Sequence, residues 1–213
     1  MVSAEGYASQ AEPISLSADV TRDFVLQDTA VATGLVLTAR GEPAVRASVR
    51  GSVGASTPGG GVAVETMTDP QGRFSLTGLG GGNLILTARH QAEAAVLGPE
   101  SLENGGRKEV TIRLGPGASV AGAVSWDDGP PSAAAMVMVA TNLGDVSRLE
   151  IETPTYPDGT FAVRGILPGE ISLRAVPRGR RVDERRAEPG LDQASLTLKP
   201  GEQRTGLKLV VRH

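Results

Sequence analysis

The sequence predicts an all-β protein made of two tandem Greek-key β-sandwich domains of about 85–95 residues each. A long internal repeat is the first reason: Asp69–Leu79 returns 87 positions later as Tyr156–Ile166, with its glycines and phenylalanine in register. Composition is the second reason, because 28 glycines and 14 prolines among 213 residues separate short apolar runs without a helical period. We therefore expect two copies of one domain, each with its own core.

The repeat sets the expected domain boundaries and strands. Residues 28–115 form the first predicted sandwich and residues 116–213 the second. Short alternating or apolar runs predict strands at 31–38, 44–52, 62–68, 73–77, 84–89 and 110–114, then at 119–126, 135–141, 149–153, 160–164, 171–176 and 207–212. Residues 91–107 and 177–201 are expected to be the variable connections. Pro154 and Pro157 should confine their strand to a sheet edge or a turn.

Residues 1–27 resemble the end of a domain rather than its beginning. Residues 14–18 and 23–26 alternate as strands do, and Leu26 precedes Gly34 by the same eight positions that separate Leu114 from Gly122. We expect residues 1–27 to be the terminal strands of a preceding, truncated repeat, or else an N-terminal extension that adds a strand. Such a strand can pair with an exposed sheet edge, which makes strand exchange through residues 14–26 a predicted partner contact.

Charge and composition narrow the classes of partner. The formal net charge is −3, with both signs interspersed, so we expect binding neither to nucleic acid nor to anionic membranes. No apolar run reaches the roughly 20 residues of a membrane span, and residues 1–30 lack a signal-peptide pattern. Cysteine is absent, and only 3 of 21 basic residues are lysine, which suggests a GC-rich bacterial genome. We expect a part of a longer protein that is periplasmic, cell-surface or extracellular.

The repeated turn has a physical explanation. In Asp69-Pro70-Gln71-Gly72, proline presets φ at the second position and glycine takes the left-handed position, after which Phe74 points into the core. The second copy keeps the glycine and the phenylalanine. The predicted structural turn and core residues are Asp69, Gly72, Phe74, Gly78, Gly159, Phe161 and Gly165.

These motifs resemble a known family. A strand with a glycine, a turn with glycine and proline, then Asp-Pro-x-Gly-x-Phe and Gly-Leu before an alternating strand are similar to carboxypeptidase regulatory-like domains, which are transthyretin-like (prealbumin-like) sandwiches. The resemblance covers nearly all of residues 28–213, twice. It implies an accessory domain and not the catalytic domain of a peptidase. The sequence departs from the family where Tyr156 replaces the aspartate, and where Leu84 and Ile171 stand in place of a frequent tyrosine.

Catalytic and cofactor sites find little support in the sequence. His90 and His213 are the only histidines, which leaves no set for a zinc peptidase or a Ser-His-Asp triad. Glu150 and Glu152 share a strand face and resemble a glycosidase pair, although an exposed face explains them more simply. The glycine runs at 59–61 and 78–82 lack the Lys-Ser/Thr ending of a phosphate loop. We predict no cofactor, no enzymatic activity and no metal site; the weak calcium candidates Asp127 and Asp128 form a solvated turn more simply.

Two surface features are candidate binding sites. The first is an arginine-rich segment that would suit an anionic polymer, although a charged loop is the usual explanation for such a segment; its candidate residues are Arg178, Arg180, Arg181, Arg185 and Arg186. The second is the pair Trp126 and Tyr156, the only plausible aromatic platforms for stacking on a glycan.

These observations favour a non-enzymatic structural or interaction module. We expect a rod-like spacer or adhesive segment of a larger exported or cell-envelope bacterial protein, whose partners are other protein domains or cell-surface polymers. The alternatives are a carbohydrate-binding module, and an accessory domain that positions a neighbouring peptidase.

Overall fold

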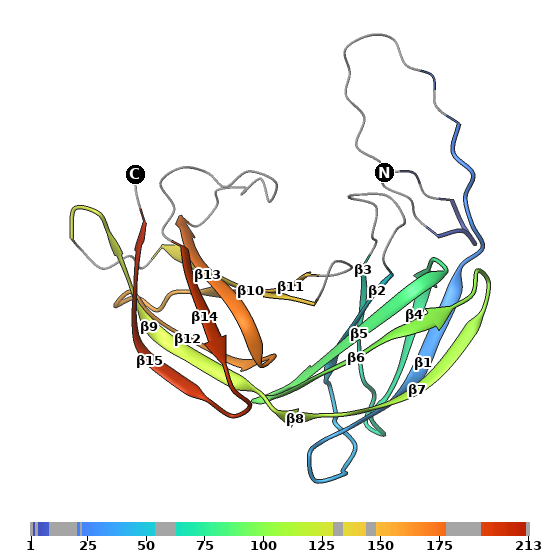
Figure 1. The fold of residues 1–213 in the computed structure, drawn as a ribbon, viewed down its shortest axis with the longest axis horizontal. Helices are drawn as coiled ribbons and strands as arrows, with labels where there is room; N and C mark the ends of the chain where they lie inside the picture. The colour runs from blue at the N-terminus through green and yellow to red at the C-terminus, as the bar shows by residue number, and fades with distance from the viewer. Residues whose placement is uncertain are drawn as a thin grey trace. The chain divides into compact units, whose positions relative to one another are not determined.

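The computed structural model describes residues 2, 4–8, 21, 23–53, 63–129, 134–143, 148–177 and 193–211. All regular elements in these ranges are β-strands, which confirms the predicted all-β class (Figure 1). A search of the same ranges finds no helix with the length and apolar character of a membrane span. The chain divides into two compact units, Met1–Gly115 and a second made of Pro116–Leu143 with Arg148–His213.

The first unit is a β-sandwich of two sheets. A three-stranded sheet has the order β4-β1-β7, in which β1 runs antiparallel to β4 and parallel to β7. The facing sheet has the order β3-β2-β5-β6-β8 (Figure 1). The strands are β1 (Ala30–Leu37), β2 (Ser48–Val53), β3 (Ala63–Met67), β4 (Arg73–Leu79), β5 (Gly82–His90), β6 (Glu93–Leu102), β7 (Arg107–Arg113) and β8 (Gly115–Pro116).

Strand alternation places the first core between these two sheets. Phe74 and Leu76 of β4 are buried while their neighbours along the strand are exposed, as expected for a strand with one solvated face. Leu84 and Leu86 of β5 enter the same cluster from the facing sheet. The core is aliphatic apart from Phe74, as the composition indicates.

The second unit repeats this strand order. One sheet is β12-β9-β15, with β9 antiparallel to β12 and parallel to β15, and the other is β11-β10-β13-β14. Its strands are β9 (Ala118–Trp126), β10 (Ala135–Asn142), β11 (Arg148–Pro154), β12 (Thr160–Ile166), β13 (Gly169–Pro177), β14 (Gln193–Leu198) and β15 (Gln203–Val211). Phe161 and Leu173 lie in a core of its own. The proline-bearing strand β11 is an edge strand, as Pro154 predicts.

Two glycines lie where each sandwich brings its parallel strands together. Gly34 of β1 is paired with Val110 of β7, and Gly122 of β9 is paired with Leu207 of β15. A Cβ atom on either glycine would overlap the carbonyl oxygen of that partner. On the opposite side, each glycine faces the core phenylalanine of the antiparallel neighbour, Phe74 or Phe161. The missing side chain therefore leaves room for both the parallel strand and the ring.

The structure differs from the predicted strands in several places. β7 and β15 begin earlier than expected, at Arg107 and Gln203, and the short strand β8 was not predicted. β6 and β14 lie within the segments 91–107 and 177–201, which were expected to be connections. β2 begins at Ser48 and not at Ala44, because Arg46 adopts a φ of 57° and turns the chain before the strand starts.

A buried threonine holds that turn in place. The hydroxyl of Thr68 accepts a hydrogen bond from the Ala47 N–H at 2.7 Å and donates one to the Ala44 carbonyl. In the second unit Thr155 occupies the corresponding place, 87 positions later, and its hydroxyl bonds to Ala135. These two residues were not singled out by the sequence, because a lone threonine near a strand carries no pattern.

The described part of residues 1–27 gives a partial view of the N-terminal segment. Tyr7 forms an antiparallel bridge with Asp28, and the Ala8 N–H donates to the Gln27 carbonyl at 2.8 Å. Residues 23–26 are not in a strand, although their exposure alternates. Residues 14–20 lie outside the described residues, so the assignment of residues 1–27 to a preceding repeat stays a prediction.

Candidate functional site

The first repeated turn is closed by backbone and carboxylate hydrogen bonds. The Gly72 N–H donates to the Asp69 carbonyl at 2.9 Å, and Gly72 has a φ of 74°. The Asp69 side chain accepts hydrogen bonds from the backbone N–H groups of Gln71 and Arg73, at 2.9 and 2.8 Å. The Asp69 carboxylate thus satisfies two turn amides, and Phe74 follows into the core.

The second turn reaches the same backbone form with a different carboxylate. The Gly159 N–H donates to the Tyr156 carbonyl at 2.9 Å, and Gly159 has a φ of 78°. Here Asp158 accepts hydrogen bonds from the Thr160 hydroxyl at 2.6 Å and the Thr160 N–H at 3.0 Å. The hydroxyl and then the amide of Thr160 lower the pKa of Asp158 below its usual value.

Gly78 and Gly165 have a matching role at a β-bulge. Gly78 has a φ of 81° and Gly165 a φ of 66°. The pairing register shifts beside each of them, between β4 and β1 in one unit and between β12 and β9 in the other. Left-handed glycines at such shifts are typical of bulges, which bend the strand and end its pairing.

The two predicted aromatic platforms differ in exposure. Trp126, at the end of β9, is partly buried and packs against the core of the second unit. Tyr156 is 57% exposed at the turn before β12. Because the core covers part of the indole, Trp126 offers less of its ring to a glycan than the sequence suggested.

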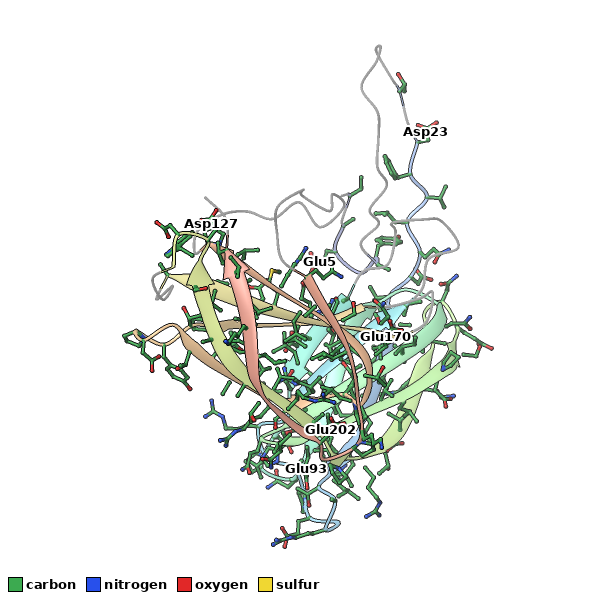
Figure 2. All side chains as sticks on the ribbon, turned by 60° about the vertical axis from the view of Figure 1, so that its left-hand side comes forward. Glu5, Asp23, Glu93, Asp127, Glu170 and Glu202 are labelled. Atoms are coloured by element: carbon green, nitrogen blue, oxygen red, sulfur yellow. The ribbon has the colours of Figure 1, made fainter. Side chains whose placement is uncertain are left out.

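Asp127 and Asp128 form an exposed turn at the end of β9 (Figure 2). The Asp127 N–H donates to the Val211 carbonyl at 3.1 Å, and the Gly129 N–H donates to the Trp126 carbonyl at 3.0 Å. Within the described ranges, no group of three or more His, Cys, Asp or Glu side chains is placed to hold a metal ion.

The arginine-rich candidates lie outside the described residues, so their binding of anions stays a prediction. These are Arg178, Arg180, Arg181, Arg185 and Arg186. Arg174, at the start of the same segment, is described and belongs to β13. It donates to Glu150 of β11 at 3.1 Å, and the two side chains are only 14% and 15% exposed. Glu150 therefore neutralises a partly buried arginine, and it does not lie on an open face as the sequence suggested.

A similar set of charged groups lies on the outer face of the first unit. Arg50 of β2 is paired in register with Glu65 of β3, whose carboxylate accepts the Ser48 hydroxyl at 2.6 Å. Burial lowers the pKa of Arg89, while the charge of Glu65 partly offsets this effect. Sequence analysis missed these groups because they come from strands far apart in the chain, and only strand register brings them together.

A hollow of about 510 Å³ lies at the turn between β14 and β15. It is lined by Thr197, Lys199, Pro200, Gly201, Glu202 and Arg204. The Glu202 carboxylate accepts hydrogen bonds from the Lys199 backbone N–H at 2.9 Å and an Arg204 guanidinium N–H at 2.7 Å, and these bonds lower its pKa. The Glu202 carboxylate therefore stabilises the turn between β14 and β15, and its hydrogen bonds within that turn account for the lowered pKa without a bound ligand.

Comparison with protein-family models finds no match, and comparison with curated proteins finds none either. Solved structures that match this chain include the TIE protein of Bacillus anthracis, with 12% identity and a TM-score of 0.33 over 86% of this chain. A streptococcal ancillary pilin has 15% identity and a TM-score of 0.31 over 89% of the chain. The shaft pilin SpaA of Lactobacillus rhamnosus GG has 7% identity and a TM-score of 0.30 over 87%.

This chain spans 33% of the length of the TIE protein and 65% of the length of the streptococcal pilin. At such identities and TM-scores, no activity or partner of those proteins is carried over to it. The predicted kinship with carboxypeptidase regulatory-like domains stays a prediction, because no family model matches.

Proposed function

We propose that this protein is a non-enzymatic structural or interaction module. It acts as a rod-like spacer or adhesive segment of a larger exported or cell-envelope bacterial protein, in the periplasm, at the cell surface or outside the cell. Its two sandwiches are carboxypeptidase regulatory-like domains that cover residues 28–115 and 116–213. Other protein domains or cell-surface polymers are its partners.

The observation that carries this proposal is how the conspicuous carboxylates are used. Asp69 and Asp158 close turns, Glu150 neutralises a partly buried arginine, and Glu202 holds the β14–β15 turn. Each carboxylate has hydrogen-bond partners that belong to the scaffold. A catalytic acid or base needs instead a group placed to reach a substrate. The partners of these four carboxylates thus support a structural role.

The link between the units supports a spacer. Gly115-Pro116-Gly117 joins strands that belong to separate cores, and Gly115–Pro116 is itself paired as β8 in the larger sheet of the first unit. A short linker that contains proline is stiffer than a glycine-serine linker of the same length. Two such units in series suit a spacer that separates the neighbouring parts of a longer protein.

Small-angle scattering of the full chain tests the spacer. We expect a longest dimension well above that of a compact sphere of 21.9 kDa. A variant with a flexible Gly-Ser insertion after Gly117 should broaden the distribution of distances. A maximum dimension equal to that of one sphere would contradict the rod-like part of the proposal.

The carbohydrate-binding alternative has in its favour that one of its two candidate platforms is exposed. Tyr156 is 57% exposed, whereas Trp126 packs on the core. A glycan array followed by titration of the Tyr156→Ala variant tests it. Binding that Tyr156→Ala abolishes and Tyr7→Ala leaves intact would favour the carbohydrate-binding module over the spacer.

A further inference from the structure

The exposed edges of the four sheets are not equally protected. In the described structure, eight strands lie at an edge, and each edge offers backbone N–H and C=O groups to another strand. Charged residues, prolines and bulges normally discourage such pairing. Seven edge strands have one of these features: Glu65 in β3, Arg73 in β4, Lys108 in β7, Pro116 in β8, Glu150 in β11, Arg164 in β12 and Arg204 in β15.

β14 is the exception among these edges. Its sequence Gln-Ala-Ser-Leu-Thr-Leu has no charged residue, proline or glycine. All six residues pair with β13 in continuous register, without a shift. Gln193, Ser195 and Thr197 are exposed, while Ala194 and Leu196 are only partly buried against the core. The edge is therefore uncharged and regularly paired, and it leaves part of its apolar face uncovered.

The corresponding strand of the first unit is protected twice. The two-residue strand β8 pairs with part of β6, so β6 is not the last strand of its sheet. Its pairing with β5 is also interrupted near Gly98, which has a φ of 116°. Among the described residues, this position in the strand order therefore has a further strand beside it in one unit and none in the other.

We propose that β14 is a self-association surface, at which β14 of a second copy of this chain adds antiparallel. Residues that face each other across an antiparallel pair lie on the same side of the sheet. If the pair is centred on Ser195, Gln193 faces Thr197 of the partner subunit, and Ala194 faces Leu196 of the partner subunit. Polar side chains then face polar ones and apolar side chains face apolar ones.

Charge explains why a second copy pairs at this edge and not at β3 or β11. Self-pairing of β3 about its centre would set Glu65 against the same residue of the other copy, and self-pairing of β11 would bring Glu150 and Glu152 together. Like charges directly opposite destabilise a strand pair. β14 has no such conflict, and a two-fold contact closes upon itself and ends at a dimer. This inference does not depend on the proposed spacer function.

Sedimentation velocity of the full chain over a concentration series provides the test. We expect the wild type to shift from monomer to dimer as concentration rises. Ser195→Lys and Ser195→Glu should each stay monomeric, because residue 195 faces the same residue of the second copy and the two like charges would repel. An equimolar mixture of the two variants should recover the dimer, because lysine then faces glutamate. Ala63→Lys, on edge strand β3, is the matched control and should dimerise as the wild type does.

A second readout does not depend on the introduced charges. The chain has no cysteine, so Ser195→Cys provides a single thiol. Under oxidising conditions it should give a covalent dimer, whereas Ala63→Cys should not. A wild type that stays monomeric at every concentration overturns the proposal. A dimer that survives Ser195→Lys but is lost on removal of residues 1–22 also overturns it, in favour of strand exchange through residues 14–26.

Discussion

The turns before β4 and β12 have the same backbone form with different side chains. In the first turn Asp69 is the first residue, and its carboxylate accepts hydrogen bonds from two backbone amides. In the second turn Tyr156 is the first residue, and the carboxylate of Asp158, two positions later, accepts a hydrogen bond from the Thr160 N–H. Both turns keep the 2.9 Å bond from the glycine N–H to the first carbonyl. The left-handed glycine and its backbone bond therefore define the turn, and the carboxylate can move within it.

The same contrast extends to the complete units. Inside each sandwich the glycine at the parallel strands, the phenylalanine beside it and the bulge glycine are alike. At the sheet edge the described parts of the units differ, since β6 has the two-residue strand β8 beside it and β14 has no further strand. Packing restricts the interior because volume and backbone spacing must match, whereas the edge is free to vary with the partner.

Removal of the core rings should have the largest effect. Phe74→Ala and Phe161→Ala each leave a cavity in an aliphatic core, which costs about 3–5 kcal/mol in the free energy of unfolding. Because the cores are separate, each change should destabilise its own unit. Hydrogen exchange measures the loss of protection in each unit, on peptides from 30–53 for the first unit and from 148–177 for the second. Equal loss of protection in both units after either change would refute the separation.

Filling the space beside the parallel strands should rank second. Gly34→Ala and Gly122→Ala set a Cβ against the carbonyl oxygen of Val110 or Leu207, so the strands must move apart. Overpacking of this kind costs about 1–3 kcal/mol, and more where backbone must shift. Denaturant unfolding measures it. Gly80→Ala is the control, since its Cβ would meet only Ala8 at 3.8 Å, and it should change stability little.

Substitution of the two buried threonines should destabilise the two units by different amounts. Thr68→Val leaves the Ala47 N–H without its 2.7 Å acceptor and should cost about 1–3 kcal/mol. Thr155→Val should cost less, because its bonds to Ala135 are longer, at 3.3 and 3.2 Å. Serine at either position keeps the hydroxyl and should recover most of the stability. A larger loss at Thr155 than at Thr68, measured by urea unfolding, would reverse this ranking.

The smallest effect concerns pH. Hydrogen bonds from Thr160 lower the pKa of Asp158 in the folded protein below its unfolded value. The stabilisation is therefore present above the unfolded pKa and is lost as pH falls through the folded pKa. Thr160→Val should weaken the dependence of stability on pH in the acidic range where carboxylates titrate. Thermal unfolding midpoints measured across that pH range provide the test. Ser75→Val, on an exposed position of β4, is a control that should leave the profile unchanged.

Most of the fold could be predicted from the sequence, and the exceptions share a cause. The strands with clear alternation, such as β4 and β12, were located to within two residues at each end. β6 and β14 were missed because Ala95, Gly98 and Pro99 break the pattern of one, and a long variable segment precedes the other. Their strand character depends on pairing with β5 and β13, which no local pattern reports.

The candidate site could be predicted less well. The turn glycines Gly72 and Gly159 were identified because left-handed backbone favours one residue type. The Arg174–Glu150 pair was not, because its members lie on different strands and meet only through register. The anion-binding arginines fall outside the described residues, so the structure adds nothing to that prediction.

Local chemistry was therefore enough to determine the all-β class, the repeated turns and the aliphatic cores, since each follows from the conformational preference of a few adjacent residues. Only the tertiary structure decided which strands run parallel, which carboxylates neutralise arginines and which sheet edge stays open. Those features arise from hydrogen bonds and packing between segments that are distant in the chain, and they exist only once the sheets have formed.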